Sequence, residues 1–261
     1  MLHLQFASHT DPGKVRELNE DSLGWHTPAD AETGGPWLFV LADGVGGHAA
    51  GEVASRMAVD VITGGVAGSR DAPAASLRKL LQLANQKIHD AGLSGAHGGA
   101  MASTVVALAL GQDRATLAHA GDSRCYLWRA GSLRQMTRDH RFAAEQAALG
   151  ILTSREAEAA PTQSYLTRSL GADLMVQPEI NEFPLLAGDL FLLCSDGLHG
   201  AFDVPALERE LAAPRPLDAA ARRLVELARD RDGSDNISAI LVRVLEVERM
   251  AMYRGRAYRV R

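Results

Sequence analysis

The order of the hydrophobic segments is the feature that most constrains the fold of this chain. Apolar residues recur at helical spacing in two segments that follow one another directly, Ala49–Val66 and Ser76–Leu93. Runs typical of strands flank this pair, and a further amphipathic helix is expected over Leu217–Arg229. Because a parallel sheet would need a helix between successive strands, paired helices among runs of strands indicate an α+β fold with antiparallel sheets.

The expected strands are short apolar runs bounded by turn residues. They are Trp37–Ala42, Ser103–Leu110, Ala115–Ala120, Cys125–Arg129, Leu133–Met136, Leu190–Cys194 and Ile237–Val247. Ala130 and Gly131 supply a hairpin turn within this series, whereas the polar, alanine-rich segment Arg141–Ala160 is expected to be weakly helical. Since no linker divides the chain, we expect a single domain over residues 1–247, followed by a basic C-terminal tail over residues 248–261.

Composition excludes several classes of protein. The 261 residues include 27 Lys and Arg against 32 Asp and Glu, and a net charge of −5 lacks the basic footprint of a nucleic-acid binder. No apolar run reaches the roughly 18–20 residues that a membrane span needs, and the first ten residues do not resemble a signal peptide. Cys125 and Cys194 are too few for a disulfide scaffold. We therefore expect a cytoplasmic protein that binds neither nucleic acid nor membrane.

Aspartates stand beside the ends of four expected strands. They are Asp43, Asp122, Asp196 and Asp235. A single Asp-Gly pair most often marks a turn, but four strand ends in one compact fold can bring their carboxylates together. Two carboxylates about 4 Å apart repel by roughly 4 kcal/mol at an effective dielectric of 20, so such a set must be protonated or hold a divalent cation. Oxygen ligands suit Mg²⁺ or Mn²⁺. Glu20 and Asp21 add two acids close to Arg16, whose guanidinium can bind phosphate.

Eight short motifs occur in a fixed order along nearly the whole chain. They are RELNED at Arg16–Asp21, ADGVGGH at Ala42–His48, Ser103-Thr104, GDSR at Gly121–Arg124, TRDH at Thr137–His140, Leu170-Gly171, SDGL at Ser195–Leu198 and DNI at Asp235–Ile237. Together they resemble the metal-dependent serine/threonine protein phosphatases of type 2C, the PPM family, especially its compact bacterial members. The resemblance implies a four-layer α-β-β-α sandwich of two antiparallel sheets flanked by helix pairs, with a flap over about residues 141–167.

The resemblance also implies which residues hold metal ions. Asp43 matches the acid that bridges two Mn²⁺ or Mg²⁺ ions, and the carbonyl of Gly44 matches a ligand of one of them. Asp196 and Asp235 match the acids that complete the shell of the first ion. Asp122 matches a ligand of a third, weaker ion that shares Asp196.

The remaining matches imply the reaction. Glu20 and Asp21 correspond to acids that hold metal-bound waters, and Arg16 corresponds to the residue that binds the substrate phosphate. The implied activity is hydrolysis of phosphoserine or phosphothreonine in proteins by a metal-bridging hydroxide. Such an enzyme reverses a companion serine/threonine kinase, and the resemblance favours a monomer.

One departure from the family pattern concerns the general acid. Some members carry a histidine directly after the A-D-G motif, proposed to protonate the leaving group, and Val45 stands there in this chain. We interpret His48, three residues later, as structural, with a metal-bound water as the proton donor.

Other readings of the sequence are weaker. Gly44–Ala49 matches a dinucleotide fingerprint, but a second helix follows where that unit needs a strand. The nine histidines contain no H-E-x-x-H and no metal-like pair, which argues against a zinc hydrolase. The serious rival is a catalytically inactive phosphatase-fold binding module. Because the acids and Arg16 are all present, we expect an active enzyme.

Overall fold

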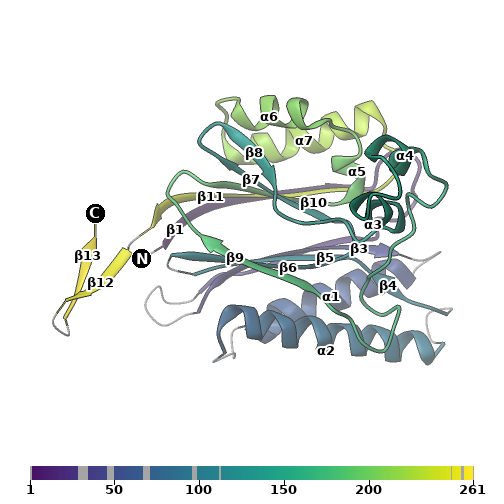
Figure 1. Ribbon diagram of the computed structural model, residues 1–261, viewed down its shortest axis with the longest axis horizontal. Coiled ribbons are helices and arrows are strands. Elements are labelled where there is room, and N and C mark those ends of the chain that lie inside the picture. The colour runs from purple at the N-terminus through teal and green to yellow at the C-terminus, as the bar shows by residue number, and fades with distance from the viewer. Residues whose placement is uncertain are drawn as a thin grey trace.

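Two antiparallel sheets lie face to face at the centre of the molecule, with helices outside each of them (Figure 1). The computed structural model describes residues 2–28, 35–45, 50–66, 71–95, 99–111, 113–247, 249–253 and 256–260. The helices α1 (Ala50–Val66) and α2 (Pro73–Leu93) cover one sheet, and α6 (Val204–Ala212) and α7 (Leu217–Arg231) cover the other. This arrangement confirms the predicted α+β sandwich of four layers.

Each sheet combines hairpins of consecutive strands with strands that are distant in the sequence. The first has the order β1-β11-β10-β7-β8, and the second has the order β2-β3-β5-β6-β9 with β4 paired to β3. The strands of the first sheet are β1 (Leu2–Asp11), β11 (Ile237–Val247), β10 (Leu190–Cys194), β7 (Arg124–Arg129) and β8 (Ser132–Gln135). Those of the second are β2 (Asp21–His26), β3 (Trp37–Val45), β4 (Ala102–Ser103), β5 (Val105–Leu110), β6 (Arg114–Ala120) and β9 (Glu179–Pro184).

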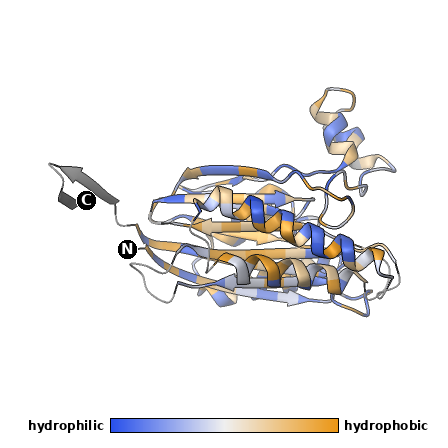
Figure 2. Cartoon of the chain, turned by 90° about the horizontal axis from the view of Figure 1, so that it is seen from below, coloured by the Kyte–Doolittle hydropathy of each residue, from blue (hydrophilic) through white to orange (hydrophobic). Residues whose placement is uncertain are grey.

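Hydrophobic side chains fill the three spaces between the four layers. One cluster lies between the second sheet and α1 and α2, one between the first sheet and α6 and α7, and one between the two sheets. Along β5, Val105 and Ala107 face the helices, whereas Val106 and Leu108 face the other sheet. Because both faces of the central strands are buried, they read as continuous apolar runs. In Figure 2 the strands are largely hydrophobic, and hydrophilic residues line the helices in front of them.

The strands that the sequence pattern did not predict are polar ones at or near the sheet edges. Among the described strands, β1 pairs only with β11 and β9 pairs only with β6, and β1 alternates between partly exposed and exposed residues from Leu2 to Phe6. Edge strands of this kind lack the apolar run that marks a central strand. The expected strand Ser103–Leu110 is interrupted at Thr104, where the N–H of Asp43 donates to the side-chain hydroxyl Oγ1 at 3.1 Å and not to the carbonyl of Thr104.

The connecting segments agree with several expectations. Ala130 and Gly131 have φ values of 50° and 82°, which confirms the two-residue hairpin turn between β7 and β8. The segment expected to be weakly helical contains two short helices, α3 (Phe142–Ala148) and α4 (Ser154–Ala159). After residue 247, β12 (Arg249–Tyr253) and β13 (Arg256–Val260) pair with one another in a separate two-stranded sheet. No helix in the described part of the chain combines the length and apolar character needed to cross a membrane.

Candidate metal centre

Most of the predicted site residues line one open pocket of about 410 Å³. Its described lining consists of Arg16, Glu20, Asp43, Gly44, Val45, Thr104, Asp122, Ser164, Leu166, Asp196 and Asp235. Asp21 stands outside this lining. It pairs with Asp43 across the β2–β3 ladder and is buried, and side chains of directly opposed residues lie on the same face of a sheet. The fold therefore gathers acids from five separate stretches of the sequence.

The backbone of Asp43 is held by the Ser103-Thr104 motif. The carbonyl of Asp43 accepts hydrogen bonds from the N–H of Thr104 at 2.8 Å and from Ser103 Oγ at 3.0 Å. Its own N–H donates to Thr104 Oγ1 at 3.1 Å. The strand Trp37–Ala42 of the sequence analysis therefore extends to Val45, and Asp43 lies within β3 instead of following it. This explains why two small hydroxyl residues occur in the motif series.

Glycines beside the acids allow close approach of neighbouring backbones. A Cβ atom on Gly44 would lie 2.2 Å from the carbonyl oxygen of Gly51 at the start of α1. A Cβ atom on Gly197, in the short helix α5 (Asp196–His199), would lie 2.2 Å from the carbonyl oxygen of Asn236. The glycines of these two Asp-Gly pairs therefore allow tight packing around the acids. This differs from the usual role of an Asp-Gly pair, which is to form a turn.

Burial makes these acids reluctant to ionise. Burial raises the pKa of Asp21 to about 7, and the negative charges of Asp196 and Asp235 add to the shift. Burial, followed by the charge of Asp21, raises the pKa of Asp43 well above its usual range. The pKa of Asp196 is raised to about 6 by burial and by the charge of Asp122. In the absence of a cation, such a set keeps protons that isolated carboxyl groups would lose at neutral pH.

The chemistry of these donors fits a hard divalent cation. Asp21 Oδ2 accepts a hydrogen bond from Ser195 Oγ at 2.7 Å, whereas Asp21 Oδ1 is buried with no hydrogen-bond partner among the described residues. The acids and the carbonyl of Gly44 offer only oxygen atoms, which are the ligands that Mg²⁺ and Mn²⁺ prefer. A cation here would favour the ionised carboxylates and so remove the cost of burying them.

Two arginines neutralise part of this negative charge. Arg16 Nη2 lies 2.8 Å from Asp235 Oδ2. Arg141 contacts Asp122 Oδ2 through Nε, and its Nη2 lies 3.1 Å from Asp196 Oδ2. The sequence analysis singled out Arg16 but gave Arg141 no role in the site. The available signal was that Arg141 directly follows the TRDH motif, and this does not by itself indicate a contact with acids.

The predicted flap, residues 141–167, closes back on itself beside the pocket. Arg141 and Leu166 form an isolated antiparallel bridge. The N–H of Phe142 donates to the carbonyl of Tyr165, and the N–H of Thr167 donates to the carbonyl of His140, both at 2.8 Å. Because Leu166 also lines the pocket, the base of this segment forms part of the site.

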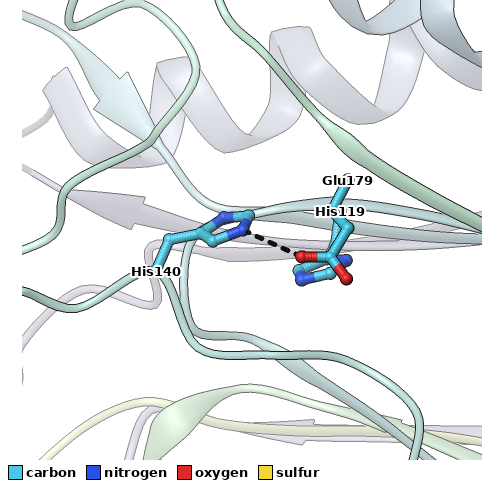
Figure 3. A group of neighbouring side chains, drawn as sticks. All are labelled: His119, His140 and Glu179. Carbon is cyan, nitrogen blue, oxygen red and sulfur yellow. Dashed lines mark ion pairs between the residues drawn. The ribbon is translucent and has the colours of Figure 1, made fainter. Parts of the chain in front are cut away.

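A group that the sequence analysis missed consists of His119, His140 and Glu179 (Figure 3). The prediction that the histidines form no metal-like pair was wrong for the folded chain. One ligand atom from each of the three residues lies within 4.8 Å of the others. The two imidazole rings stack, with centroids 4.7 Å apart and planes 6° from parallel. β6 and β9 supply two of these residues, and the TRDH motif supplies the third, so the separation in sequence hid the pair.

The hydrogen bonds of His140 favour a structural role for this group. The N–H of Gly121 donates to His140 Nδ1 at 3.2 Å, and His140 Nε2 faces Glu179 Oε2 at 3.6 Å. Burial lowers the pKa of His140 to about 4 and keeps the ring neutral. A guanidinium nitrogen of Arg168 lies 3.3 Å from the same Nε2. Both ring nitrogens of His140 therefore already have partners within the chain, and His140 supports the turn that carries Asp122.

The structure also bears on the general acid. Val45 lines the pocket and is 39% exposed, and it has no proton to donate. His48, which was interpreted as structural, lies outside the described residues.

Comparison with known proteins identifies the family. Residues 8–245 match the family Protein phosphatase 2C. The chain is similar to the protein phosphatase PhpP of Streptococcus pneumoniae, with 34% identity over 241 residues, which cover 91% of this chain and 96% of the relative. It is similar to the solved serine/threonine phosphatase of S. agalactiae, with a TM-score of 0.85 and 31% identity over 94% of this chain and 100% of that one.

A third comparison includes bound metal. The catalytic domain of the serine/threonine protein phosphatase PstP, solved in complex with 2 manganese ions, matches 94% of this chain and 100% of its own length, with a TM-score of 0.82 and 32% identity. The family match covers most of the chain, and the acids of the shared motifs surround one pocket. This chain therefore belongs to the protein phosphatase 2C family.

Proposed function

We propose that this protein hydrolyses phosphoserine and phosphothreonine in other proteins with two Mn²⁺ or Mg²⁺ ions. The observation that carries the proposal is a single pocket that holds Asp43, Asp196 and Asp235 together with the guanidinium of Arg16. Membership of the protein phosphatase 2C family supports the reaction. The manganese ions in the similar PstP catalytic domain support the cofactor.

The proposed protein ligands of the two ions are Asp43, Asp196, Asp235 and the carbonyl of Gly44, and Glu20 and Asp21 are proposed to hold water beside them. Once bound, the ions supply a hydroxide nucleophile at neutral pH and positive charge beside the phosphate. Three hydrogen bonds from Ser103 and Thr104 to the backbone groups of Asp43 fix this residue in β3. This ligand is therefore positioned by the sheet before any cation arrives, which limits the reorganisation on binding.

Arg16 is proposed to bind the phosphate of the substrate. Its guanidinium is 49% exposed, so it can reach an incoming phosphoprotein. The hydrogen bond and the charge of Asp235 raise the pKa of Arg16 still further, and the side chain is charged at every physiological pH. A planar guanidinium can donate two parallel hydrogen bonds to phosphate oxygens, which orients the ester as well as attracting it.

No cysteine nucleophile is available in the described lining of the pocket. Cys125 and Cys194 are fully buried in the hydrophobic clusters, and burial raises the pKa of both thiols far above neutrality. Water is therefore proposed to attack phosphorus directly, without a phosphoenzyme. With Val45 at the rim, the leaving serine or threonine oxygen is proposed to take its proton from water in the pocket.

The biological setting follows from the substrate chemistry. A phosphatase of this kind requires a serine/threonine kinase that forms the ester, and we propose such a kinase as its companion. We also propose that the protein acts as a monomer in the cytoplasm, as the family resemblance and the two isolated thiols suggested.

The test is hydrolysis of a phosphothreonine peptide by the wild type and by Asp43→Asn, with Mn²⁺ and with a chelator. We expect turnover only with metal, and a loss of at least about 10²-fold in kcat for the variant. Asp218→Asn is the matched control, because Asp218 is an exposed acid on α7 whose ion pair with Arg222 lies within that helix. A wild type that binds Mn²⁺ and phosphopeptide without turnover would identify the inactive binding module instead.

A further inference from the structure

Arg141 is a cation already placed between two acids of the pocket. Its Nε contacts Asp122 Oδ2, and its Nη2 lies 3.1 Å from Asp196 Oδ2. These are the two residues to which the family resemblance assigns a third, weaker metal ion. The guanidinium and that ion would therefore compete for the same two carboxylates.

The contacts of Arg141 are well enclosed. The side chains of Arg141 and Asp122 are 21% and 6% exposed. Burial raises the pKa of Asp122, and the charge and hydrogen bond of Arg141 oppose that shift. Behind the acid, His199 Nε2 donates to the carbonyl oxygen of Asp122 at 3.1 Å and fixes its backbone. The buried Asp122 and the partly exposed Asp196 thus obtain their counter-charge from the chain itself.

We propose that the guanidinium of Arg141 takes the place of a third metal ion, so that this enzyme binds only the two ions of its core site. This inference rests on the proposed function, because it assumes that the core acids hold metal. A divalent ion and a guanidinium repel each other strongly at contact distance, so only one of them can hold Asp122 Oδ2 and Asp196 Oδ2. Arg141 uses only Oδ2 of Asp196, which leaves Oδ1 for a core ion.

The position of Arg141 in the chain gives this substitution a mechanical consequence. Arg141 is the first residue of the flap and bridges to Leu166 at its other end. Leu166 and Ser164 line the pocket. The ion pairs of Arg141 therefore anchor the base of the flap beside the site without any metal, and expulsion of Arg141 by a cation would release that anchor.

The experiment counts the Mn²⁺ ions bound at equilibrium dialysis by the wild type, by Arg141→Gln and by the double variant Arg141→Gln/Asp122→Asn. The control is Arg129→Gln. Arg129 also pairs with a buried acid, Asp189, but with no second carboxylate to form a chelate. Thermal unfolding checks that each variant is folded. Arg141→Met, which keeps the apolar stem of the side chain, repeats the measurement if the glutamine variant does not fold.

We expect two ions in the wild type and in Arg129→Gln, and three in Arg141→Gln. The additional site should bind Mn²⁺ at least about tenfold more tightly than any further site of the wild type, and Asp122→Asn should remove it. Equal stoichiometry in the wild type and the Arg141 variants overturns the proposal, as does a third ion in the wild type that Asp122→Asn removes. If the wild type binds no ion but Arg141→Gln gains one that depends on Asp122, the proposed function fails and the role of Arg141 stands.

Discussion

The ionised form of Asp21 is expected to destabilise the metal-free protein, and the substitution Asp21→Asn tests this. Asp21 is 8% exposed, and burial raises its pKa from 3.8 to about 7. The folded protein therefore keeps a proton on Asp21 at pH values where the unfolded chain has lost it. The stabilisation from this proton is complete below pH 3.8 and is lost as the pH rises through about 7.

The two pKa values give the size of the effect. With 3.8 in the unfolded chain and about 7 in the folded protein, Asp21 adds about 3 kcal/mol more stability at pH 5 than at pH 8. Asparagine has nearly the same shape and can accept the hydrogen bond from Ser195, but it has no proton to lose. Asp196 adds little to this difference in stability, because its side chain is 34% exposed and water screens its charge.

Urea unfolding followed by circular dichroism, with a chelator present, measures the difference. Burial lowers the pKa of His140 and His199, so these rings act in the opposite direction, but they are present in both proteins and cancel in the comparison. Between pH 5 and pH 8, the wild type should lose about 3 kcal/mol more stability than Asp21→Asn. The exposed control Asp218→Asn should behave as the wild type does. An equal pH dependence in the wild type and Asp21→Asn would refute the reasoning.

Three further predictions concern packing, charge and the proton donor. Gly197→Ala places a Cβ atom 2.2 Å from the carbonyl of Asn236, so it should cost about 1–3 kcal/mol in urea unfolding and lower kcat; wild-type values for both would contradict the close approach. Arg129→Ala removes the bidentate partner of the Asp189 carboxylate, which is 1% exposed. We expect this variant to lose about 2–4 kcal/mol of unfolding free energy, and an unchanged free energy would show that another group replaces Arg129. Val45→Ala should change kcat on the phosphothreonine peptide by less than about threefold, since Val45 has no proton to donate; a larger change would show that the methyl groups position the substrate.

Continuous apolar runs were the most reliable guide to the fold. Leu190–Cys194 was predicted with the bounds that β10 has, because every residue of that strand is buried against one cluster or another. β1 was missed, because its alternating polar residues become a strand only through pairing with β11, which follows more than 200 positions later in the chain. A local pattern of apolar and polar residues indicates which side chains are buried, but it does not indicate which strand is the partner.

The acids of the site follow the same division. That Asp43, Asp196 and Asp235 line one pocket could be predicted from the motifs, since each acid lies in or beside a strand whose apolar residues mark it as buried. Two contacts depend on how distant segments pack in the folded chain. They are the ion pairs of Arg141 with Asp122 and Asp196 and the stacking of His119 on His140. Short-range hydrophobic periodicity and residue type in the sequence by itself determined the α+β class and the acidic character of the pocket, and the order of the motifs indicated the four layers through the family resemblance. Only the tertiary structure decided which charges and rings meet, because those contacts depend on the packing of segments that are not neighbours in the chain.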